Sequence, residues 1–188
     1  LTSADKAALD TIAAATGVIK ATVKGSVEEL AGVTTAATDA ITFVITGDYA
    51  EAADLKILDD RTSATVNASA IKEIDGLAAD LKTIYASKTI SGLGNEVVTI
   101  TAPASADAVN AILKATTGKV TATVLTSTDA KDLNADLKDA KATDALKLTV
   151  TGEATAADLK ALDAKTSEII TATGITLITG NAADVKTV

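Results

Sequence analysis

The chain has 188 residues, of which 47% are hydrophobic and 2% aromatic, and it contains one proline and no cysteine, histidine, methionine or tryptophan. Its formal net charge of −8 argues against nucleic acids and anionic membrane surfaces as partners. The missing cysteines exclude a disulfide framework and thiolate metal sites, and no apolar stretch approaches the roughly 18 residues of a membrane span.

Eight similar segments follow one another along the chain. They begin near residues 2, 26, 51, 77, 105, 129, 155 and 181, at intervals of 24 to 28 residues. Each predicts a short, alanine-rich helix followed by a strand rich in threonine, valine and isoleucine. A period in the twenties is typical of repeat proteins in which every repeat is one supersecondary element.

Six of the eight predicted helices carry an apolar pair at i and i+3, which places both side chains on one helix face. We expect these residues to form the core of the repeats: Leu30, Leu55, Leu58, Leu81, Ile84, Val109, Ile112, Leu133, Leu159 and Leu162. Lys6, Leu9, Val33, Val185 and Val188 occupy the same positions elsewhere. Asp136 is polar at such a position, and the next residue, Leu137, can take its place.

An acidic residue precedes the first apolar position in seven of the eight segments. Three residues earlier stand good N-cap residues in five of them: Thr2, Ser26, Asp129, Thr155 and Asn181. This spacing predicts capping boxes, in which the acid also faces the positive end of the helix dipole. The alternative is a calcium site at some of these acids, with Asp54, Asp80, Asp132, Asp158 and Asp184 as the candidates. We expect no other cofactor.

The predicted strands follow the helices in chain order. The clearest are 18–24, 41–46, 97–101, 120–125 and 146–151, each with at least partial alternation. Two segments, 64–74 and 169–179, are interrupted and predict two short strands each. Gly92-Leu-Gly94 lacks the rest of a phosphate loop, so we interpret it as a turn.

Successive helix–strand repeats predict a right-handed α/β solenoid of about eight repeats of about 25 residues, with a parallel sheet. No linker or change of composition divides the chain, which predicts a single domain over residues 1–188. The chain begins within one helix-start pattern and stops within another, as expected of a processed chain or a segment of a longer array.

No catalytic motif is present. Without histidine there is no imidazole base or ligand. The acid pairs Glu28-Glu29 and Asp59-Asp60 lack the aromatic residues with which polysaccharide enzymes hold sugar rings. Thr-x-Thr pairs at residues 99–101, 121–123, 149–151 and 171–173 place both threonines on one face of a strand. That face is either an ordinary solvated face or an ice-binding one.

The segments Ala156-Ala-Asp-Leu-Lys-Ala-Leu-Asp-Ala-Lys-Thr-Ser167 and Thr179-Gly-Asn-Ala-Ala-Asp-Val185 resemble repeats of very large secreted cell-surface proteins of marine bacteria and cyanobacteria. The resemblance implies an extracellular structural role in a surface layer, sheath, filament or adhesin. We expect a non-catalytic chain that associates with itself, and possible partners are glycans and cell-envelope components. The alternative is an extracellular binding module for calcium, glycan or ice.

Overall fold

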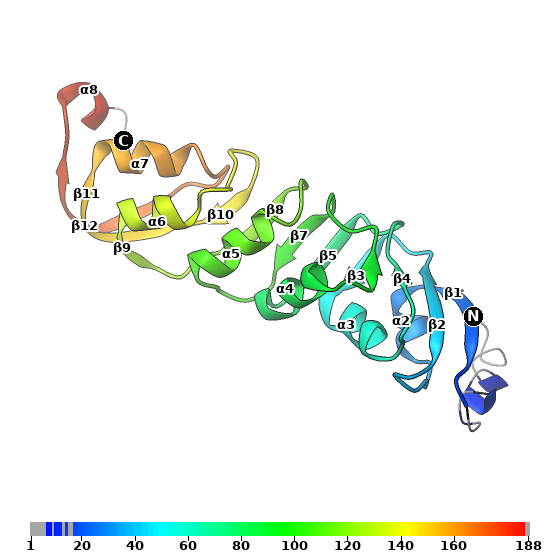
Figure 1. Ribbon diagram of the computed structural model, residues 1–188. Coiled ribbons are helices and arrows are strands. Elements are labelled where there is room, and N and C mark those ends of the chain that lie inside the picture. The colour runs from blue at the N-terminus through cyan, green and yellow to red at the C-terminus, as the bar shows by residue number, and fades with distance from the viewer. Residues whose placement is uncertain (1–6, 9, 13, 15–16, 187–188) are drawn as a thin grey trace. The chain divides into compact units, whose positions relative to one another are not determined.

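A computed structural model describes residues 7–8, 10–12, 14 and 17–186. Helices alternate with strands along the chain, and every strand pair described is parallel (Figure 1). The chain divides into two compact units, residues 1–97 and 98–188. The protein therefore has a mixed α/β fold, and each unit is described in turn.

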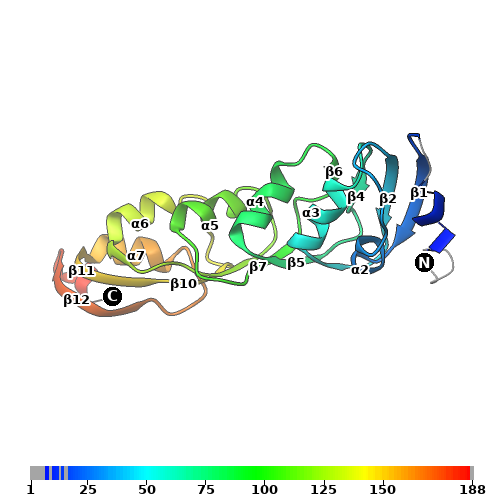
Figure 2. The ribbon, with the colours of Figure 1, turned by 90° about the horizontal axis from the view of Figure 1, so that it is seen from below.

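The first unit has two sets of parallel strands and a row of helices. The first set is β1 (Lys20–Gly25), β2 (Ala40–Ile45), β4 (Val66–Asn67) and β6 (Ile90–Ser91), in the order β1-β2-β4-β6. The second set contains the pair β3 (Tyr49–Glu51) and β5 (Glu73–Gly76). The helices are α2 (Val27–Ala31), α3 (Ala52–Asp60) and α4 (Ala78–Ala86). They lie side by side, as Figure 2 shows for α3 and α4.

The second unit repeats this pattern with longer strands at its end. The parallel strands β10 (Ala145–Lys147), β8 (Val120–Thr123) and β7 (Val97–Ile100) are neighbours in that order. A separate sheet has the order β12-β11-β9, formed by β12 (Thr171–Thr179), β11 (Thr149–Thr155) and β9 (Ser127–Asp129). The helices are α5 (Ala106–Leu113), α6 (Ala130–Asp136), α7 (Ala156–Asp163) and α8 (Ala182–Val185).

Paired strands recur at a nearly constant distance along the sequence. Tyr49 pairs with Glu73, Val66 pairs with Ile90, and Thr121 pairs with Ala145. Each partner lies 24 residues further on, which matches the period of the sequence pattern. We use the word repeat for one strand, or two consecutive strands, together with the helix that follows.

The helices begin where the capping residues predict. Ser26 forms a full capping box with Glu29, and Thr155 and Asn181 accept the backbone N–H of Asp158 and Asp184. Asp129 accepts two backbone N–H groups at the start of α6. Ser105 also caps α5, although no acid follows it at the third position. Thr2 lies outside the described residues. Side-chain oxygens thus satisfy N–H groups that a helix cannot pair internally.

Some sequence predictions were wrong in detail. Helices α2 to α8, predicted only to be short, have four to nine residues. Residues 146–151 do not form one strand, because β10 ends at Lys147 and β11 starts at Thr149. Residues 169–179 contain one strand, β12, rather than two. At Gly174 the register with β11 shifts, and a Cβ there would lie 2.5 Å from Cγ2 of Thr151, so the Thr151 side chain leaves no room for a larger residue.

The turn interpretation of Gly92-Leu-Gly94 fits the backbone. Gly92 has a φ of 88°, and a Cβ added there would meet the backbone of Ser69 at 2.7 Å. Only glycine fits this conformation and this space. Among the residues that the structure describes, no helix is both long and apolar enough to cross a membrane.

Candidate functional site

Two buried aspartates occupy equivalent places in the two units. Asp39 precedes β2 and is 1% exposed; its Oδ1 accepts the N–H of Ile19 at 3.0 Å and its Oδ2 accepts the N–H of Ala36 at 3.0 Å. Asp144 precedes β10 and is fully buried; it accepts the N–H groups of Val120 at 2.9 Å and Lys141 at 2.8 Å. Each carboxylate therefore joins its own loop to the strand segment of the previous repeat.

A threonine and a serine that follow the next helix complete this arrangement in the first unit. The hydroxyl of Thr62 donates to the carbonyl of Ile41 at 2.6 Å and accepts the N–H of Ala64 at 2.9 Å. The N–H of Ser63 donates to the carbonyl of Asp39 at 2.8 Å. These bonds link the end of α3 to the start of β2, one repeat earlier.

The second unit has the same bonds at Thr166 and Ser167. The Thr166 hydroxyl donates to the carbonyl of Leu146 at 2.8 Å and accepts the N–H of Glu168 at 3.1 Å. The N–H of Ser167 donates to the carbonyl of Asp144 at 2.7 Å. We call each set of a buried aspartate with this threonine and serine a junction.

A basic residue precedes each of these threonines and binds the end of an earlier helix. Arg61 donates through Nη1 to the carbonyls of Ala31 and Val33, the latter at 2.7 Å. Lys165 donates through Nζ to the carbonyl of Leu137 at 2.8 Å. Carbonyls at a helix C-terminus lack internal partners and carry partial negative charge, so a cation there is favourable.

A third buried acid, Glu96, stands directly before β7. It accepts the N–H of Gly94 at 2.8 Å and the hydroxyl of Tyr85 at 3.0 Å. A buried carboxylate is stable only when hydrogen bonds replace its lost hydration. The three acids therefore act as fixed acceptors for backbone and hydroxyl groups within the fold.

The repeated acids that could bind calcium lie apart from one another. Asp54, Asp80, Asp132, Asp158 and Asp184 each occupy the first turn of a different helix. Hydrogen bonds from Lys160, at 2.8 Å, and from Asn181 lower the pKa of the Asp184 carboxyl. Within the described residues, no three acidic side chains gather as a metal site would require.

The helix residues expected in the core are all buried: Leu30, Leu55, Leu58, Leu81, Ile84, Val109, Ile112, Leu133, Leu159 and Leu162. Leu137 is also buried, whereas its neighbour Asp136 is exposed. These side chains hold the helices against the strands, so they explain the packing and leave the polar junctions as the second kind of recurring contact.

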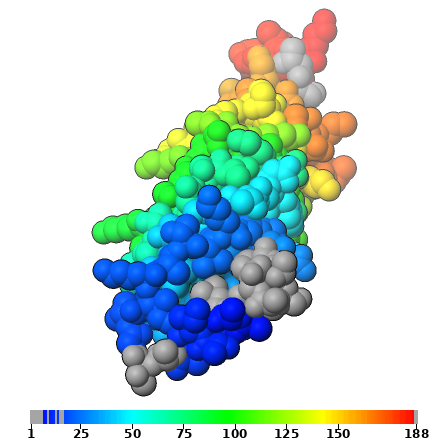
Figure 3. Space-filling model, turned by 90° about the vertical axis from the view of Figure 1, so that its right-hand side faces the viewer, coloured from blue at the N-terminus to red at the C-terminus, as the bar shows by residue number. Residues whose placement is uncertain are grey.

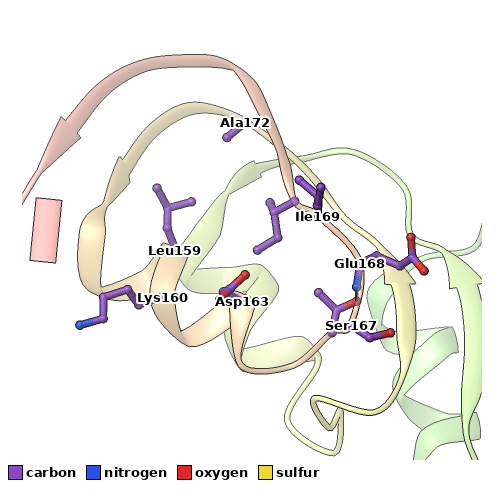
Figure 4. A pocket seen from close by; sticks show the side chains of 9 residues that line it. Leu159, Lys160, Asp163, Ser167, Glu168, Ile169 and Ala172 are labelled. Atoms are coloured by element: carbon purple, nitrogen blue, oxygen red, sulfur yellow. Dashed lines mark hydrogen bonds between the residues drawn. The ribbon is translucent and has the colours of Figure 1, made fainter. Parts of the chain in front are cut away.

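An open pocket lies beside the last full-length helix, α7. Its volume is about 380 Å³, and its lining includes Leu159, Asp163, Ser167, Ile169 and Ala172. In Figure 4, Leu159 points toward the space between α7 and the segment leading to β12, while Lys160 and Glu168 point away on opposite sides. Ile169 is 93% exposed. The lining thus combines apolar residues with two acidic residues, Asp163 and Glu168, and one lysine, Lys160.

A second hollow, in the first unit, is acidic. Tyr49 lines it together with Glu28, Glu51 and Asp54. Burial raises the pKa of the Tyr49 hydroxyl, and the carboxylates of Asp75 and Glu51 raise it further. This hollow carries negative charge but presents no grouping typical of catalysis or metal binding.

Sequence reasoning missed the junctions, because Asp39 and Asp144 fall between the predicted helices and strands and drew no interpretation. A signal was present. The tetrapeptide Ala-Thr-Asp-Ala occurs at 37–40 and 142–145, and a basic residue followed by Thr-Ser occurs at 61–63 and 165–167. These two motifs keep nearly the same separation in both units, which indicates a tertiary contact.

Comparison with models of known families, with curated proteins and with solved structures gave no match.

Proposed function

We propose that the chain is a structural, non-catalytic repeat segment of an extracellular assembly, and that it associates with copies of itself. The observation that carries the proposal is the pair of equivalent junctions. The buried aspartate, the threonine and the serine of each junction all bind the backbone of a neighbouring repeat. The most elaborate polar arrangements of the chain thus serve cohesion between repeats.

The finer architecture in this proposal is a right-handed α/β solenoid of about eight repeats. Two facts support it: the strand partners lie about 24 residues apart, and paired parallel strands are connected through helices. Such crossovers are right-handed in nearly all proteins. The repeat beginning near residue 2 lies largely outside the described residues. In a stack of this kind each repeat contacts only its neighbours, and stability is approximately a sum over repeats and the interfaces between them.

The extracellular location rests on composition and on the resemblance of the repeats to secreted surface proteins. Cysteine and methionine, the two residues most open to oxidation, are both missing from the sequence. The lack of histidine and cysteine removes the commonest nucleophile, base and metal ligand, which supports the non-catalytic part of the proposal.

Negative-stain electron microscopy of the purified chain tests the proposal. We expect filaments, sheets or a lattice as protein concentration and ionic strength rise, with calcium present in one series and a chelator in the other. Well-dispersed single particles under every condition would contradict it. Ordered arrays only with calcium would instead favour the binding-module alternative.

A further inference from the structure

One sequence motif of the first unit plays no part in the junctions. Residues 67–69, Asn-Ala-Ser, have the pattern Asn-x-Ser without a central proline, at which asparagine side chains accept N-linked glycans. In the other four asparagines of the chain the second residue that follows has no hydroxyl group: Asn95, Asn110, Asn134 and Asn181. The motif therefore occurs once in the sequence.

The three residues of the motif alternate between the core and the solvent. Asn67 is the last residue of β4 and is half-buried, Ala68 is fully buried, and Ser69 is exposed. The N–H of Ala68 donates to the carbonyl of Ser91 at 2.8 Å, which ties the centre of the motif to the next repeat. Because successive side chains of an extended segment point to opposite faces, the burial of Ala68 directs both Asn67 and Ser69 outward.

A tight turn directly after β4 joins the two outward residues. The N–H of Ser69 donates to Oδ1 of Asn67 at 3.1 Å, which forms an Asx turn. The N–H of Ile71 donates to the carbonyl of Ala68 at 3.0 Å, so Ser69 stands at the corner of this turn. A Cβ at Gly92, in the next repeat, would lie 2.7 Å from the backbone of Ser69. Two adjacent repeats thus fix the conformation of the motif.

The side-chain nitrogen of Asn67 is accessible. Among the described residues no group accepts a hydrogen bond from this Nδ2, and the one buried side-chain atom without a partner there is Oδ1 of Asn134. The unbonded Nδ2 of Asn67 is therefore in contact with solvent. The hydrogen bond from Ser69 to Oδ1 stabilises the negative charge that gathers on this oxygen when Nδ2 loses a proton, so it prepares Nδ2 for attack on an electrophile.

The repeat architecture does not require asparagine at position 67. In the parallel sheet, Asn67 stands opposite Val44 on β2 and Ser91 on β6. These two residues occupy the same place one period earlier and one period later. A valine and a serine thus serve the same structural position, which leaves the amide of Asn67 available for another role.

We propose that Asn67 is the acceptor of an N-linked glycan, which a lipid-linked oligosaccharide supplies outside the cytoplasm. Nδ2 attacks the anomeric carbon of the donor sugar, so a C–N bond forms and the C–O bond to the lipid pyrophosphate breaks. The pyrophosphate leaves with the electron pair of that bond, and Nδ2 gives up one proton to a base of the transferring enzyme. This inference rests on the extracellular location proposed above.

A glycan at Asn67 affects which faces of the first unit can associate. Asn67 lies in a row with Lys24, Val44 and Ser91 on the solvent-facing side of β1-β2-β4-β6. In Figure 3, where the side of β1 faces the viewer, cyan atoms from the middle of the first unit are exposed behind the blue atoms of its start. Because a glycan is bulky and hydrophilic, it keeps this face in water, and self-association uses other faces.

Site-resolved mass spectrometry of the extracellular chain from its natural source tests the proposal. Trypsin cleaves after Arg61 and Lys72 and releases residues 62–72, in which Asn67 is the only asparagine. We expect this peptide to carry a glycan, and fragmentation that retains the sugar should locate it on Asn67. An unmodified peptide, or a sugar found only on its serine or threonine residues, would overturn the site.

Three variants made in the same host test the motif itself. Asn67→Gln and Ser69→Ala should abolish the glycosylated peptide, because the first displaces the acceptor nitrogen and the second removes the hydroxyl of the motif. Ser69→Thr should retain it, since threonine keeps the backbone N–H and a hydroxyl. Asn95→Gln is the matched control, because Asn95 is exposed and lies outside the motif, and the glycan should stay. Circular dichroism verifies folding of each variant. A glycan that persists in Ser69→Ala would contradict recognition through this motif.

The outcomes separate this inference from the proposed function. An extracellular chain with an unmodified Asn67 overturns the glycan site and leaves the structural role standing. A chain found only in the cytoplasm overturns the proposed location and this inference together.

Discussion

A buried carboxylate is costly unless its oxygens receive hydrogen bonds, and Asp39 and Asp144 meet this condition with backbone N–H groups from two segments each. The same residues also offer their carbonyls to Ser63 and Ser167. One residue thus fixes a loop, a preceding strand segment and a following helix end. This combination explains why an acid occupies an otherwise apolar environment.

We expect Asp144→Asn to destabilise the chain by about 1.5–3 kcal/mol, the usual loss for hydrogen bonds to a charged group. An asparagine keeps one acceptor oxygen but directs an NH₂ group at a backbone N–H. Urea denaturation measures the change. Asp136→Asn is the control, because Asp136 is exposed, and we expect a change within about 0.5 kcal/mol there. Equal losses of unfolding free energy in both variants would contradict the stabilising role of the junction.

Glu29 gives a pH-dependent test of helix capping. Its Oε2 accepts the backbone N–H of Ser26 at 2.9 Å, and this bond is the main cause that lowers the pKa of the Glu29 carboxyl. Because the folded pKa lies below the unfolded one, the stabilisation is complete above the unfolded value and is lost as pH falls through the folded value. NMR titration of the carboxyl carbon should show this lowered pKa.

A stability comparison checks the same point independently. The Glu29→Gln variant has no carboxylate to protonate, so its urea midpoint should fall less than that of the natural chain between about pH 6 and about pH 3. If the urea midpoints of the two proteins fell equally with pH, the capping acid would contribute nothing to folding stability.

At the scale of elements, the sequence was most informative about helices. The i, i+3 apolar pairs and the N-cap residues located their starts and buried faces, because helix periodicity and capping are local properties. The predicted first and last residues of the strands agreed less well with the structure. The break between β10 and β11 and the shift at Gly174 depend on pairing with residues about 24 positions away, which no local pattern records.

Leu58 tests the contribution of this apolar helix face. Leu58→Ala should cost about 2–5 kcal/mol, because Leu58 is fully buried in α3 and its loss leaves a cavity. Ile57→Ala, in the same helix but 37% exposed, should cost under about 1.5 kcal/mol. Thermal and urea unfolding provide the comparison. Similar costs at both positions would mean that α3 does not pack through the predicted face.

At the scale of the whole molecule, the repeat period followed from the sequence, but the sites of cohesion did not. Asp39 and Thr62 are 23 residues apart in sequence and become a junction only when two repeats are neighbours.

The net charge of the chain determines the ionic strength at which two copies can associate. A chain with a formal charge of −8 repels its copies, and the screening length falls from about 30 Å at 0.01 M salt to about 3 Å at 1 M. Sedimentation velocity of the natural chain across this range tests self-association most directly. We expect the assembled fraction to rise with both ionic strength and protein concentration. A single monomeric species throughout would contradict the structural role proposed for this protein.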